Sequence, residues 1–195
     1  ASPKLIGNIL YALGRLQTPW NDHTDVCREK KHNVLPLPDD VSEELLAQFT
    51  NSMDAIFSLP APNALPKKNI PLYHQHARAL NFGLNGLARM TTWESLNEQQ
   101  QEKLFALIHK GISSMKSSVH LANFVWSLGA MRLPLARLST ESQAGLFLLV
   151  GCQVAHMDSF EVVWTLWALQ QMGVTFKSMP ESTSKALINR AIQVI

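Results

Sequence analysis

The sequence contains few cysteines, few charged residues and no long hydrophobic run. Its two cysteines, Cys27 and Cys152, cannot form a disulfide framework, which weakly favours a reducing compartment. No stretch approaches the roughly 18 uninterrupted apolar residues that a membrane-spanning helix needs. Charged residues make up 16% of the chain and the net charge is +2, so the overall charge gives no strong indication of nucleic-acid binding. The hydrophobic content of 46% is typical of a globular chain with a sizeable core.

Sequence motifs of catalysis are also missing. There is no glycine-rich phosphate loop, no G-x-S-x-G elbow and no H-E-x-x-H zinc motif. Cys152 follows an apolar stretch that predicts a buried helix, where a thiol is inert. His23, Asp25, Cys27 and His32 are metal-ligand types, but their spacing is looser than that of zinc sites and favours a plain loop. The sequence therefore predicts no catalytic residue, no metal site and no cofactor.

What the chain does contain is a repeated pattern. Four seven-residue segments share leucine or methionine at fixed positions with small residues between them, at 10–16, 84–90, 125–131 and 166–172. The last three segments begin 41 residues apart. Self-similarity at such a period is typical of stacked helical hairpins. The sequence therefore predicts an all-α solenoid of four helical hairpins with a repeat of about 41 residues.

The repeats divide the expected solenoid into four units. These units span about 3–59, 75–116, 117–157 and 158–195, and a proline-rich link covers 60–74. Residues 17–40 form a long insertion in the first unit, of a length uncommon in compact arrays. The apolar segments at both termini lack the polar surface of a capping repeat, so we expect the chain to be a fragment of a longer array.

Each unit is expected to hold two helices, the first of them at about 3–16, 75–90, 118–131 and 158–172. Spacings of four, three and three residues place four apolar columns on one face of these first helices, and we expect the columns to be buried. Small residues such as Gly14, Gly86 and Gly129 lie between them and predict close contact between helices. The columns are Ile6, Leu80, Leu121 and Val162; Leu10, Leu84, Val125 and Leu166; Leu13, Leu87, Leu128 and Leu169; and Leu16, Met90, Met131 and Met172.

Local signals mark several helix ends. The second helices are expected at about 41–59, 97–115, 139–157 and 181–195. Asn97 followed by Gln100 predicts a capping box, and Ser139 before Ser142 predicts a similar start. Gly173 is typical of a residue that ends a helix.

Two families of helical repeats share part of this pattern. The segment Leu121-Ala-Asn-Phe-Val-Trp-Ser-Leu-Gly-Ala-Met131 resembles the core Leu-Ala-Asn-x-Leu-Trp-Ala-Leu-Ala-Lys-Leu of octotricopeptide repeats, hairpins of about 38 residues in organellar RNA-processing factors. The 41-residue period, with Trp20 and Trp93 just beyond the repeated core, is more similar to SKWP-type repeats of about 42 residues in large type III effectors of plant-pathogenic bacteria. The Ser-Lys-Trp-Pro tetrapeptide itself is absent. The resemblance covers 74–195 well and 3–59 loosely.

A second face of the first helices varies in kind from unit to unit. Offsets of four, three and four residues place sixteen positions on it, and we call this face the outer stripe. Its members are Lys4, Asn8, Tyr11 and Arg15; Arg78, Phe82, Asn85 and Arg89; Val119, Asn123, Trp126 and Ala130; and Phe160, Trp164, Trp167 and Gln171. Eleven of them are the candidate ligand-binding residues: Asn8, Tyr11, Arg15, Arg78, Asn85, Arg89, Asn123, Trp126, Trp164, Trp167 and Gln171.

The chemistry of the outer stripe suits single-stranded nucleic acid. Aromatic rings stack on bases, Asn and Gln bind base edges, and Arg binds phosphate. The alternative is that Trp126 and Trp167 simply fill space between neighbouring units, as aromatic residues at helical spacing usually do.

Two functions follow from these observations. The near-neutral charge and the 41-residue period favour a non-catalytic recognition module, a fragment of a large type III effector that acts as an interaction scaffold and binds a host protein. The octotricopeptide-like core favours an array that binds single-stranded RNA. The resemblances imply an intracellular location, reached by type III secretion into a host cell or by import into an organelle.

Overall fold

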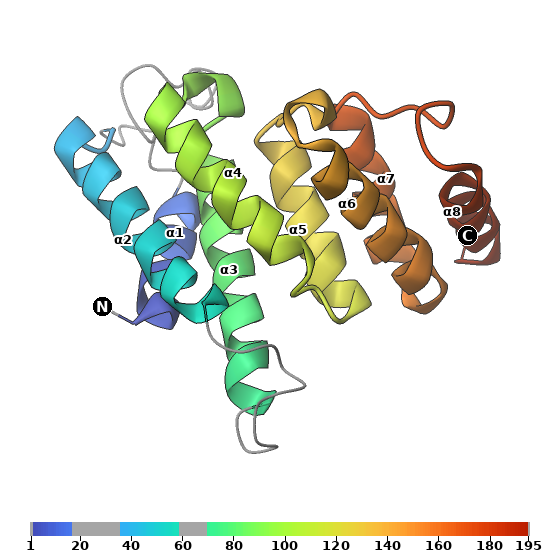
Figure 1. Ribbon diagram of the computed structural model, residues 1–195, viewed down its shortest axis with the longest axis horizontal. Helices are drawn as coiled ribbons and strands as arrows, with labels where there is room; N and C mark the ends of the chain where they lie inside the picture. The colour runs from blue at the N-terminus through green and yellow to red at the C-terminus, as the bar shows by residue number, and fades with distance from the viewer. Residues whose placement is uncertain (1, 17–35, 59–69, 195) are drawn as a thin grey trace. The chain divides into compact units, whose positions relative to one another are not determined.

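The computed structural model describes residues 2–16, 36–58 and 70–194, and within them all regular structure is helical, with no strand (Figure 1). The predicted all-α fold class is therefore confirmed for these residues. The chain forms two compact units, residues 1–111 and 112–195. The first unit holds α1 (Pro3–Arg15), α2 (Asp39–Phe57), α3 (Ile70–Met90), the 3-10 helix η4 (Trp93–Ser95) and α4 (Glu98–Ile112), whose last residue lies at the boundary. The second holds α5 (Ser118–Ala130), η5 (Leu135–Arg137), α6 (Thr140–Gln153), η6 (Val154–His156), α7 (Ser159–Gln171) and α8 (Glu181–Val194).

The helix starts follow the local sequence signals. At α4 the backbone amide of Gln100 donates to Asn97 Oδ1 at 2.9 Å, and the amide of Asn97 donates to Gln100 Oε1 at 3.1 Å, which confirms the predicted capping box. The amide of Ser142 donates to Ser139 Oγ at 3.2 Å, as expected for α6. These side chains satisfy amides that the first turn of a helix leaves without a partner.

Close contacts through glycine join the helices of the first unit. A Cβ on Gly7 would lie 2.6 Å from the carbonyl oxygen of Ala79, and a Cβ on Gly14 would lie 2.6 Å from that of Gly86. Because no side chain separates the backbones there, α1 and α3 pack closely along their length. On α2, the ring of Phe49 packs against Gly83.

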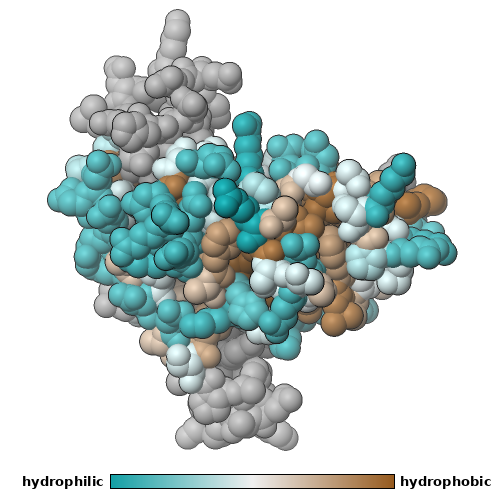
Figure 2. Space-filling model, turned by 45° about the horizontal axis from the view of Figure 1, so that its top comes forward, coloured by the Kyte–Doolittle hydropathy of each residue, from teal (hydrophilic) through white to brown (hydrophobic). Residues whose placement is uncertain are grey.

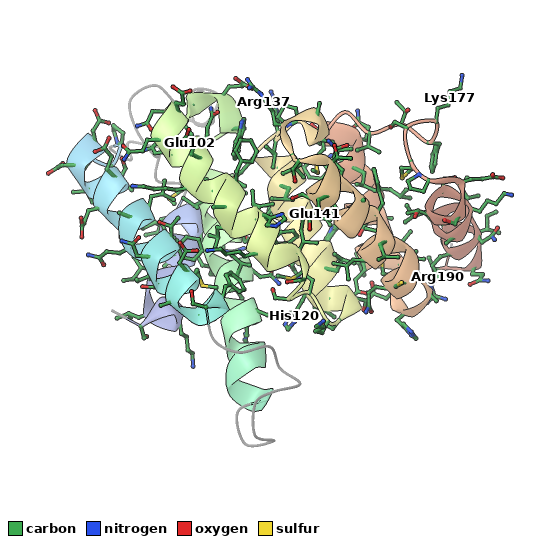
Figure 3. The ribbon with its side chains drawn as sticks, in the orientation of Figure 1. Glu102, His120, Arg137, Glu141, Lys177 and Arg190 are labelled. Carbon is green, nitrogen blue, oxygen red and sulfur yellow. The ribbon has the colours of Figure 1, made fainter. Side chains whose placement is uncertain are left out.

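The second unit pairs its helices in the same manner. Gly129 of α5 contacts Ala168 of α7 so closely that a Cβ on Gly129 would lie 2.5 Å from the Ala168 Cα atom. The segments that follow α5 and α7 are also joined, since the amide of Leu135 donates to the carbonyl of Met172 at 2.9 Å. α8 packs on α6 and α7, and Arg190, labelled in Figure 3, donates from Nε to the carbonyl of Met157 at 2.8 Å.

The predicted apolar columns form the core, with three departures. Thirteen of the sixteen residues are buried. Leu13 and Leu166 are half-buried, whereas Leu16 is 67% exposed, so its predicted burial is wrong. Leu16 differs from Met90, Met131 and Met172 in its column because of what surrounds it. The three methionines are covered by neighbouring segments, whereas no described segment covers the end of α1.

Most of the expected insertion at 17–40, with its four metal-ligand types, lies outside the described residues. Among the helices of the described ranges, none combines the length and the hydropathy that crossing a membrane requires.

Candidate functional site

The outer stripe lies at the surface of both units. Of its sixteen side chains, Asn85 alone is buried, and the other fifteen are exposed or half-buried. Trp126 is half-buried and Trp167 is 41% exposed, so neither ring is enclosed in a core. The face that the helical offsets define is therefore available to a ligand within each unit.

In the first unit, the stripe combines stacked rings with cations. The rings of Tyr11 on α1 and Phe82 on α3 stack with centroids 5.2 Å apart and an interplanar angle of 30°. The guanidinium of Arg78 lies over the Phe82 ring, with Cζ 5.1 Å from the centroid. Further along α3, Arg89 Nε donates to Asn85 Oδ1 at 2.9 Å, which holds a second guanidinium in place.

In the second unit, the stripe is aromatic and uncharged. Trp126 of α5 and Trp167 of α7 stack with centroids 6.2 Å apart and an interplanar angle of 26°. Phe160 and Trp164 form a tilted pair on α7 at 6.4 Å, and Phe160 is 70% exposed. Asn123 donates one amide hydrogen to the carbonyl of Val119 at 2.8 Å, which directs its side chain along α5.

The two parts of the stripe differ in electrostatics. The first-unit part carries the cations Lys4, Arg15, Arg78 and Arg89, and neither α1 nor α3 contains an Asp or Glu. The second-unit part carries no charged residue. On the right of Figure 2, over α5–α8, hydrophobic residues reach the surface among hydrophilic ones. An anionic polymer therefore suits the first part, and stacking or apolar contact suits the second.

Other candidate chemistry is sparse in the described ranges. No group of three His, Cys, Asp or Glu side chains there has the arrangement of a metal site. Cys152 is exposed, so the prediction that it lies in a buried part of its helix is wrong. The buried side of α6 is formed by Leu146, Phe147 and Val150, and Cys152 lies about 200° around the helix from Val150.

One surface was not predicted. Leu5, Ile9, Ala12 and Leu16 are all exposed and follow one another at spacings of four, three and four residues along α1; we call them the α1 apolar face. The signal was present in the sequence, because the apolar residues of α1 form an arc wider than the predicted buried columns, and Leu5, Ile9 and Ala12 extend it to one side.

Comparisons with known proteins give no relative: no family model, no curated protein and no solved structure matches this chain.

Proposed function

We propose that the chain is a non-catalytic recognition module built from stacked helical hairpins of about 41 residues, with the outer stripe as its ligand-binding surface. Recurring local geometry supports the repeat. Gln101 donates from Nε2 to the carbonyl of Leu96, and Gln143 donates in the same way to that of Leu138. The contact of Gly14 with Gly86 in one unit also recurs as that of Gly129 with Ala168 in the other.

The ligand that this surface suits best is single-stranded RNA. The observation that carries the proposal is the Tyr11–Phe82 stack with Arg78 over the ring, on two helices that contain no carboxylate. Stacked rings offer a platform to bases of any sequence, and cations beside it bind the phosphates. The Trp126–Trp167 stack adds a second platform in the other unit.

Salt-dependent binding tests this ligand. Binding of a randomised RNA pool should weaken steeply with salt, and the steepness of log K against log salt falls by about 0.7 for each phosphate that the protein no longer neutralises. Changing both exposed residues, Arg15→Ala with Arg78→Ala, should therefore lower the steepness by about 1.4. The matched control is Arg137→Ala with Lys177→Ala, which removes two exposed cations outside the stripe (Figure 3).

The two RNA outcomes are distinct. An unchanged slope in the control double variant, with a reduced slope in the stripe variant, supports the proposal. Equal effects of the two double variants, or no binding at about 50 mM salt, where phosphate contacts are strongest, would rule it out.

A second candidate is a scaffold that binds a protein partner, as expected for an effector-type array. The uncharged part of the stripe favours it, because exposed Phe160, Trp164 and Trp167 resemble the aromatic centre of a protein interface more than a phosphate-binding groove. Affinity capture with the double variant Phe160→Ala, Trp164→Ala separates the candidates. A protein captured by the wild type and absent from the capture by this variant, with RNA binding unchanged, would favour the scaffold.

A further inference from the structure

We propose that the α1 apolar face is a docking site for an amphipathic α-helix that carries acidic residues along one edge. Leu5, Ile9 and Leu16 are 53%, 40% and 67% exposed, and Ala12 is exposed between them. The opposite side of α1 carries Gly7 and Gly14 and packs against Ala79 and Gly86 of α3. A helix that packs closely through one side and exposes apolar side chains on the opposite side can pack between two partners, and the described residues supply the partner on one side only.

The equivalent positions of other first helices show what covers such a face. In α3 and α7 these positions are all buried, mostly by the preceding first helix of the same unit, whereas Gly83 is covered by Phe49 of α2. Ala79 and Gly86 contact α1, and Ala168 contacts α5. The positions are Ala79, Gly83, Gly86 and Met90 in α3, and Glu161, Thr165, Ala168 and Met172 in α7. This side of a first helix therefore receives another helix lying along it.

The shape of the α1 apolar face suits a helix as well. The four residues span eleven residue steps, from Leu5 to Leu16, and form a ridge about 16 Å long. Leu5 and Ile9 occupy the positions that are Ala79 and Gly83 in α3. Because their side chains are larger, a partner helix cannot approach α1 as closely as α1 approaches α3. Ordinary ridge-into-groove packing, with axes about 8–10 Å apart, is the geometry expected here.

Charge selects the partner. Lys4, Asn8 and Arg15 run along one long edge of the face, and all three are exposed. No Asp or Glu lies on α1 to balance the two cations. A second copy of the chain docking through the same face would bring these cations together, which disfavours it. A helix with Asp or Glu along the facing edge gains attraction from both.

A designed peptide tests the docking site. The probe is a labelled amphipathic peptide of about 18 residues, with leucines on one face and glutamates along one edge, added to the full chain and followed by fluorescence anisotropy. The double variant Ile9→Gln, Leu16→Gln should weaken binding at least about tenfold, because it removes the centre and one end of the ridge. The control Leu148→Gln, Phe176→Gln changes two comparably exposed apolar residues of the second unit and should leave the affinity unchanged.

Charge reversal of the probe completes the test. A peptide with lysine in place of every glutamate should bind about tenfold more weakly than the acidic one. Equal binding of the two peptides, equal effects of the two double variants, or no binding at all would overturn the proposal. A concentration-dependent dimer that the Ile9→Gln, Leu16→Gln variant abolishes, measured by light scattering, would instead assign the face to a second copy and overturn it too. RNA binding should be the same in both double variants, so failure here is separable from failure of the RNA proposal.

Discussion

Arg132 and Gly173 end two helices with the same backbone geometry, 41 residues apart in the sequence. Both have positive φ, 57° and 78°, and Arg132 is the only residue other than glycine that does so within the described part of the chain. The amides of the next residues, Leu133 and Val174, donate to the carbonyls of Leu128 and Leu169 at 3.1 and 2.9 Å. This is the Schellman arrangement, which favours glycine at the position that Arg132 occupies.

Exchanging the residue types at these two ends should change stability in opposite directions. We expect Arg132→Gly to raise the free energy of unfolding by about 0.5–1 kcal/mol, because glycine adopts positive φ without the Cβ penalty. We expect Gly173→Ala to lower it by about 1 kcal/mol. A Cβ on Gly173 would meet no atom within 4 Å, so this decrease reports backbone conformation alone. Urea unfolding followed by circular dichroism measures the change in unfolding free energy of each variant. If both variants were stabilised, or both destabilised, the assignment of the two Schellman helix ends would be contradicted.

The glycines inside helices should divide by what surrounds them. Gly129→Ala forces a Cβ into the backbone of Ala168, so we expect stability to fall by about 1–3 kcal/mol as α5 and α7 move apart. In Gly145→Ala the new Cβ would lie 3.4 Å from Ile112 Cγ2, an ordinary contact. Removing a helical glycine there should therefore stabilise by about 0.5–1 kcal/mol. Thermal unfolding of the pair gives the comparison, and a stable Gly129→Ala protein would argue against close packing of these helices.

Leucine truncation should distinguish the core from the α1 apolar face. Leu128 is fully buried, and we expect Leu128→Ala to cost about 2–5 kcal/mol through reduced burial and the cavity left behind. Leu16→Ala makes the same chemical change at an exposed position and should stay within about 0.5 kcal/mol of wild type. Denaturant midpoints report both. A small effect at Leu128 would mean that its column is not part of the core.

The Trp126–Trp167 stack should matter more for binding than for folding. Trp167 is 41% exposed, so we expect Trp167→Ala to lower stability by about 1 kcal/mol. If a base stacks there, RNA binding should weaken by about 1–3 kcal/mol. Trp93 is fully buried, and Trp93→Ala should instead cost about 3–5 kcal/mol of stability. Unfolding and filter-binding measurements on the same variants separate the effect on stability from the effect on RNA affinity. Unchanged RNA affinity in Trp167→Ala would remove this stack from the proposed binding surface.

Sequence reasoning succeeded where the cause is local. The capping box of Asn97 and Gln100 and the helix end at Gly173 depend on residues within one turn of each other. The apolar columns follow from helical period alone, which places residues on one side of a helix. The outer stripe was defined by the same helical offsets, and fifteen of its sixteen side chains are exposed or half-buried.

It failed where the outcome depends on which segments lie nearby. Leu16 fits its column as well as Met131 does, but the described structure has no segment to cover it. Tyr11 stacks on Phe82, although the two residues do not occupy equivalent positions of the repeat. Which rings meet depends on how far α1 is shifted along its axis relative to α3. Periodicity within single helices does not contain that offset.

The close backbone contacts and the outer stripe use different sides of the same helices. Gly7, Gly14 and Gly129 hold neighbouring helices together, and none of them belongs to the stripe. Substitutions at Asn8 or Asn123 therefore leave the helix spacing untouched. Under the proposed function, positions such as these are where ligand preference can change, during evolution or by design, without rebuilding the contacts between the helices.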